Sequence, residues 1–159
     1  MNQAVQGFKL FLEGVWKGKG QVIGSLNYVE ELEVKRAKGN VFTIVQRTKN
    51  EEKGPLHSEM GYLRVFPKEG EKQAKIELCI AHAFGVCEIS EGTLTENEAI
   101  LKTSSVTRTG TAKEPYVTSF TRKYQLKEDG TLYYAMYLGT NQKPEEYFHL
   151  EGELKKETA

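Results

Sequence analysis

Hydrophobic and polar residues alternate along most of the chain. Within residues 75–80, Ile76, Leu78 and Ile80 share one parity, whereas the residues between them are polar or small. Three further segments show either the same alternation or a run of β-branched and aromatic residues: 41–45, 132–138 and 150–154. A period of two with this composition predicts half-buried strands.

Clusters of turn-forming residues separate the predicted strands at regular intervals. They lie at 37–40, 52–55, 67–70, 95–98 and 128–130. Asp129-Gly130, which stands between two alternating runs, is a strong hairpin signal. Only residues 6–13 favour a helix, and their crowded apolar side chains predict one or two helical turns that plug the end of a sheet.

Roughly nine to eleven short strands in sequential hairpins, with almost no helix, indicate an all-β antiparallel barrel or a sandwich. An up-and-down barrel of this size encloses a ligand cavity, whereas a sandwich fills its middle with side chains. The sequence shows no internal repeat, linker or low-complexity segment. We therefore expect one domain over residues 1–159.

Charge and cysteine content narrow the class of protein. The 22 Lys and Arg balance 22 Asp and Glu, which argues against nucleic acid or an anionic membrane as a partner. The sequence has no apolar span long enough for a bilayer and no secretory signal. With only two cysteines, Cys79 and Cys87, we expect a reduced, cytoplasmic protein. A disulfide between them would need a near-opposite register.

A glycine-rich motif surrounds the one tryptophan. Gly14, Trp16, Gly18 and Gly20 form Gly-x-Trp-x-Gly-x-Gly at the start of the first predicted strand. In a barrel, the ring would close the floor, while the glycines would let strands bend and approach closely. The shorter Gly-x-Trp motif at this place is a loose mark of the lipocalin and fatty-acid-binding superfamily.

The longer motif and several later segments resemble the nitrobindin family of heme-binding, fatty-acid-binding-protein-like barrels, whose domain also ends some THAP-type zinc-finger proteins. The matching segments fall in family order at 55–64, 81–88, 91–92, 111–114 and 149–150. The resemblance implies a barrel of about ten strands with ferric heme b at its mouth. Family members are described as binding nitric oxide and converting peroxynitrite to nitrate.

The resemblance also implies roles for individual residues. A family histidine near the start of the last strand binds the iron, and it matches His149. The histidine of the Pro-x-His-x-Glu-x-Gly-Tyr segment lies near the heme on the other side, and it matches His57. The chain departs from the family in a shorter connection over 20–28, where Ser25 is the nearest match to a threonine that touches heme. It also departs in a longer, more acidic stretch over 141–148.

Strand parity ranks the three histidines differently. His82 shares the parity of Ile80, so it is the most inward-facing, either as a secondary pocket residue or as a hydrogen-bonded core-edge histidine. His57 shares the parity of Leu63, and it would either donate to a bound ligand or bond to backbone at a loop end. His149 falls on the polar face of its strand, so only a bulge or a rim position would aim it inward.

Two functions suit an enclosed and mostly apolar site. The leading hypothesis is a peroxynitrite isomerase in which ferric heme b, held by His149, acts as a Lewis acid. The alternative is a non-enzymatic carrier of a fatty acid or another apolar small molecule, held by inward arginines and tyrosines. The residues available for such a clamp are Arg64, Arg108, Arg122, Tyr124 and Tyr134. A weaker third reading is a filled barrel that serves as an interaction module.

Overall fold

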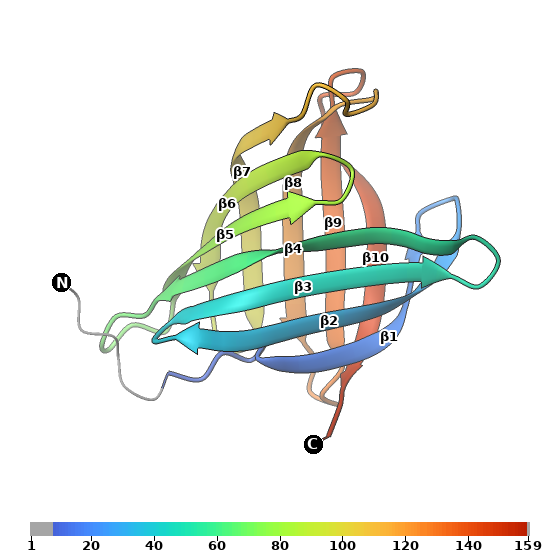
Figure 1. Cartoon of the computed structure of the whole chain (residues 1–159). Coiled ribbons are helices and arrows are strands. Elements are labelled where there is room, and N and C mark those ends of the chain that lie inside the picture. Colours follow the sequence, from blue (N-terminus) through green and yellow to red (C-terminus); the bar gives the residue numbers. More distant parts are fainter. Residues whose placement is uncertain (1–7, 159) are drawn as a thin grey trace.

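The structure, a computed structural model, describes residues 8–158, and over this range the chain forms a closed antiparallel barrel of ten strands without a helix. The strands are β1 (Gly14–Val22), β2 (Asn27–Lys38), β3 (Val41–Asn50), β4 (Gly54–Phe66), β5 (Ala74–His82), β6 (Val86–Leu94), β7 (Glu98–Arg108), β8 (Val117–Leu126), β9 (Leu132–Thr140) and β10 (Tyr147–Lys156). Each strand pairs with the next, and β1 closes the ring by pairing with β10 (Figure 1). The predicted up-and-down barrel is confirmed, and the sandwich is excluded.

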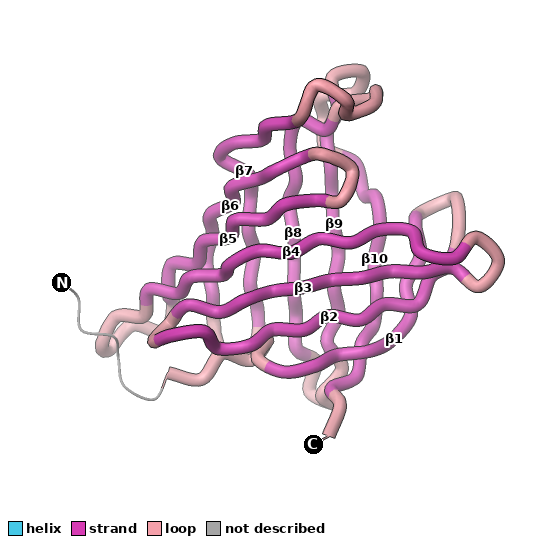
Figure 2. The backbone as a smooth tube through the Cα atoms, in the orientation of Figure 1, coloured by secondary structure: helices cyan, strands magenta, loops and turns pink. Residues whose placement is uncertain are grey.

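The two ends of the barrel differ. The loops β1–β2, β3–β4, β5–β6, β7–β8 and β9–β10 gather at one end, to the right and top of the view in Figure 2. Residues 8–13, which precede β1, pack against the hydrophobic core at the other end, where Leu10 and Leu12 are buried. We call these the open end and the plugged end. No helix of the described residues could cross a bilayer.

Helical turns were expected over residues 6–13, of which residues 6 and 7 lie outside the described range. Over residues 8–13 this expectation is wrong. Residues 8–13 contain a single turn, in which the Glu13 amide donates to the Leu10 carbonyl at 3.0 Å. Leu10 and Leu12 are both buried, although residues two apart would point to nearly opposite faces of a helix. The apolar residues do plug the barrel, but in an irregular conformation.

The glycines of β1 allow close strand contact beside a buried tryptophan. The Trp16 indole nitrogen donates to the Leu12 carbonyl at 2.9 Å, which ties β1 to the plug. A Cβ atom on Gly18 would overlap the carbonyl oxygen of Glu153 on β10, and one on Gly20 would overlap the same strand and a tyrosine ring of β2. The closure of the barrel between β1 and β10 therefore depends on the absence of side chains here.

Cys79 and Cys87 lie exposed on neighbouring strands as free thiols. In the β5–β6 register, Cys79 lies opposite Ile89, whereas Cys87 lies opposite Ala81. The two thiols are therefore diagonal neighbours rather than a directly opposed pair.

Replacing Gly18 by alanine tests the closure of the barrel. We expect Gly18→Ala to lower the free energy of unfolding by about 1–3 kcal/mol, because the methyl group must displace backbone atoms of β10. Urea unfolding followed by tryptophan fluorescence measures the effect. Gly110→Ala is the matched control, since a Cβ there meets no atom within 4 Å. Equal unfolding midpoints for the two variants would contradict the close approach of β1 to β10.

Candidate functional site

A cavity of about 330 Å³ lies at the open end of the barrel, inside the strands. Its apolar wall includes Leu56, Phe84, Val117, Phe120, Met136 and Leu138. All three histidines of the chain, His57, His82 and His149, also line it. This volume lies within the range typical of small-molecule sites. Residues that are far apart in the sequence thus meet around one enclosed apolar space.

A β-bulge turns His149 toward the cavity. The β9–β10 register shifts between Phe148 and Leu150, which pair with Tyr137 and Met136, so His149 has no partner opposite it. This irregularity interrupts the alternation that would leave the imidazole on the polar face. The ring packs edge-on against a neighbouring tyrosine at a centroid distance of 6.2 Å.

The His149 imidazole is in the form that binds metal ions. Burial lowers its pKa below the ordinary value, and the nearby His57 lowers it further. The ring is therefore neutral at pH 7, with a lone pair available to a ligand. Within residues 8–158, the hydrogen bonds of histidine rings are those of His57 and His82, and none of them involves a ring nitrogen of His149.

The other two histidines share one carboxylate oxygen. His57 Nε2 lies 3.0 Å from Glu59 Oε2, and His82 Nδ1 lies 3.2 Å from the same oxygen. The two ring nitrogens are 3.2 Å apart. The β4–β5 pairing explains this arrangement, because Glu59 and His82 are directly opposite on the inner face and His57 is two residues before Glu59. Glu59 and His82 are buried, whereas the His57 side chain is 30% exposed.

A fully buried arginine lies behind this cluster. Arg122 donates to both oxygens of Glu59, at 2.6 Å and 3.2 Å, to the hydroxyl of Tyr134 at 3.1 Å, and to Glu88. Burial opposes the ionisation of Glu59, but the charge of Arg122 and hydrogen bonds from the two histidines outweigh it. The pKa of Glu59 consequently lies well below its usual value. Glu59 is therefore ionised at neutral pH.

The carboxylates of this network were missed by the sequence reasoning. Glu59 shares the parity of Leu63 on β4, and Glu88 shares the parity of Val86 on β6. Both acidic residues are almost completely buried. A charged residue on the apolar parity of a strand is the signal that could have identified them, because such a charge needs an internal partner.

The five residues proposed for a carboxylate clamp do not form one. Arg64 and Arg108 are exposed. Arg122 faces inward, but its donors are taken by internal carboxylates. Tyr124 and Tyr134 are buried and stacked at a centroid distance of 4.8 Å. An incoming fatty-acid carboxylate would have to displace a buried ion pair to reach the guanidinium.

Ser25 lies exposed in the β1–β2 turn, where its amide donates to the Val22 carbonyl at 3.0 Å. It is not among the residues that line the cavity. Thr48 and Thr140 are the threonines that line it. The stretch over 141–148 contributes Tyr147 to the wall, while its acidic part is mostly exposed.

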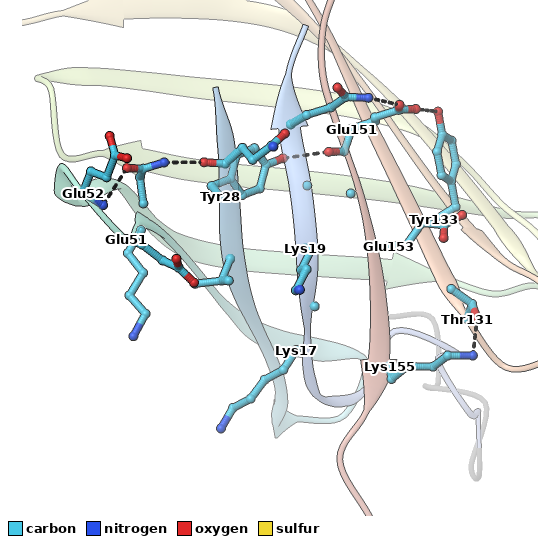
Figure 3. Close-up of a pocket in the computed structure, with 18 of the residues that line it drawn as sticks. Lys17, Lys19, Tyr28, Glu51, Glu52, Thr131, Tyr133, Glu151, Glu153 and Lys155 are labelled. Atoms are coloured by element: carbon cyan, nitrogen blue, oxygen red, sulfur yellow. Dashed lines mark hydrogen bonds between the residues drawn. The ribbon is translucent and has the colours of Figure 1, made fainter. Parts of the chain in front are cut away.

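A second hollow of about 1060 Å³ lies along β1, β2 and β10. Figure 3 shows its labelled lysine and glutamate side chains, of mixed charge, which come from β1, β10 and the β3–β4 turn. Glu151 accepts hydrogen bonds there from Gln21 at 2.8 Å and from Tyr133 at 3.0 Å. The lining of this hollow is mostly polar and charged, unlike the apolar wall of the cavity.

Glu30 is a further buried acid, next to Gln46 of the cavity wall. It is 4% exposed and accepts a hydrogen bond from the Gln46 amide. Burial raises the pKa of Glu30 to about 7. The folded protein holds this proton more tightly than the unfolded chain does. Glu30 therefore makes the free energy of unfolding fall as the pH rises from the pKa of Glu30 in the unfolded chain toward 7.

The chain is similar to known proteins along most of its length. Residues 9–156 match the family model described as "THAP4-like, heme-binding beta-barrel domain". The chain is 32% identical over 156 residues to "Peroxynitrite isomerase 2" of Mycobacterium marinum, covering 92% of this chain and 91% of that protein. It is also 32% identical over 139 residues to "Peroxynitrite isomerase Rv2717c" of Arabidopsis thaliana, covering 84% and 78%. The crystal structure of Rv2717c from M. tuberculosis matches with a TM-score of 0.75 at 31% identity, covering 93% and 94%.

The variant Glu30→Gln tests the buried acid. We expect the variant to gain stability over the wild type by about 3 kcal/mol between pH 4.5 and pH 8, since a neutral amide has no proton to lose. Chemical unfolding at several pH values measures the difference. Glu31→Gln, on the outer face of the same strand, is the matched control for removal of a carboxylate. A slope for Glu30→Gln that equals that of the wild type would show that folding does not raise the pKa of Glu30.

Proposed function

The chain belongs to the family of THAP4-like heme-binding β-barrel domains, and we propose that it binds heme b in the cavity at the open end and isomerises peroxynitrite to nitrate. The observation that carries this proposal is the neutral His149 imidazole, which a β-bulge aims into an apolar cavity. The names of relatives aligned along about nine-tenths of the chain support the choice of reaction.

The residues present fit a heme. The cavity wall is mostly apolar, as a porphyrin face requires, and His149 offers an unoccupied ring nitrogen within it. His149 would hold the iron, and the bound heme would supply a Lewis-acidic centre with a coordination position open to a small ligand. Burial keeps the imidazole neutral, so no proton competes for the ligating nitrogen near pH 7.

The protein's own residues would shape the reaction in two ways. Peroxynitrite and nitrate are isomers, so an O–O bond breaks, an N–O bond forms, and no reductant is consumed. The apolar wall excludes water and keeps the two fragments together until they recombine. His57, partly exposed and lining the cavity, is the candidate distal residue and would donate a hydrogen bond to the bound anion.

The carrier hypothesis has less support. An apolar cavity would accept a hydrocarbon chain, but Arg122 already binds Glu59 and Glu88. Breaking such a buried pair costs about 3–5 kcal/mol, which a carboxylate ligand would have to offset. Native mass spectrometry of the gently purified protein separates the two hypotheses, because a heme-mass adduct supports the first and a lipid adduct supports the second.

Two further proposals concern the cellular compartment and the number of domains. The free thiols of Cys79 and Cys87 support a reducing compartment such as the cytoplasm. The continuous closure of β1 onto β10 supports a single domain over residues 1–159.

The proposal that His149 holds the heme iron is tested by His149→Ala. We expect the wild-type protein to take up one hemin per chain and to show a Soret band that the variant lacks, because the ligating nitrogen is gone. Stopped-flow mixing with peroxynitrite should then show accelerated conversion to nitrate only for the wild type. His57→Ala is the control variant, since it changes the same cavity but should keep the Soret band. An unchanged spectrum for a folded His149→Ala protein would refute the assignment.

A further inference from the structure

We propose that His57, Glu59 and His82 form a second metal site, which binds a divalent transition-metal ion through two histidines and one carboxylate on the cavity wall. The three side chains converge so that one ligand atom from each lies within 4.8 Å of the others. This inference does not require heme binding, because none of its three ligands is His149, the residue proposed to hold the iron.

The distances between the three atoms suit adjacent ligands of one ion. The separations are 3.0 Å for His57 Nε2 to Glu59 Oε2, and 3.2 Å for the other two pairs. Ligands that occupy adjacent octahedral positions at about 2.1 Å from an ion lie about 3 Å apart. Two histidines and a carboxylate on one face of an ion form the facial triad typical of iron(II) sites.

The surroundings support a cation. His82 Nε2, the ring nitrogen that would not face the ion, lies 3.4 Å from Glu88 Oε1, and a carboxylate in this place typically orients a metal-bound histidine. The His82 ring is also stacked on Phe120 at 5.1 Å with an interplanar angle of 8°. The two carboxylates of Glu59 and Glu88 outnumber the one guanidinium of Arg122 that they bind, so the surrounding charge favours a cation.

The donor set also limits the choice of metal. Imidazole and carboxylate ligands suit Fe²⁺, Co²⁺ and Zn²⁺, whereas Cu⁺ prefers sulfur. Three protein ligands leave coordination positions for water or a small anion. Because the triad lines the same cavity as His149, an ion bound there would present a second Lewis acid to that space.

Zinc titration tests the site. The full-length chain, purified without added hemin and treated with a chelator, is titrated with ZnCl₂ by isothermal titration calorimetry. We expect one Zn²⁺ per chain, and His57→Asn should weaken binding at least about tenfold. His57 is chosen because its side chain is 30% exposed, whereas replacing Glu59 would leave Arg122 without its partner. The melting temperature of the variant confirms that it is folded.

His149→Asn is the matched control, because it removes a cavity histidine outside the triad. It should keep wild-type zinc affinity while losing the Soret band with hemin. The proposal is overturned if the wild type binds no stoichiometric zinc, if folded His57→Asn binds as tightly as the wild type, or if His149→Asn loses zinc affinity. If the protein bound no hemin, the expected zinc results would be unchanged. The two proposals can therefore fail separately.

Discussion

The interior of this barrel depends on one buried cation. The Arg122 side chain has no exposure to solvent and is held by Glu59 and Glu88. An unpaired guanidinium in this position would cost several kcal/mol, so the carboxylates from β4 and β6 must reach it. Their positions in turn place His57 and His82, because both imidazoles lie against the Glu59 oxygen.

The same network shapes the chemistry of the cavity. In a barrel that binds fatty acids through an inward arginine, the guanidinium must be available to the ligand. Here, internal carboxylates occupy it, so the polar part of the interior faces the cavity as imidazole nitrogens rather than as free positive charge. This surface suits metal ions and small anions held by a metal better than it suits a lipid carboxylate.

A local irregularity in the last strand completes the site. The bulge at His149 on β10 interrupts a strand that otherwise alternates, and it replaces an outward side chain by an inward one. The plugged end has the complementary role, because Trp16 and the buried leucines of residues 8–13 fill it with apolar side chains. A rigid, filled end and an open, histidine-lined end are thus two parts of one continuous sheet.

The sequence by itself determined the strands, several turns and the inward direction of His82, because alternation reports which face of a strand each side chain occupies. Resemblance to a family selected His149, which alternation placed on the wrong face. Only the tertiary structure decided that Glu59 meets Arg122 from 63 residues away, that Ser25 stays outside, and that residues 8–13 form a turn rather than a helix. The physical reason is that parity defines a direction within one strand, whereas bulges, register and ring closure decide which side chains of other strands lie there.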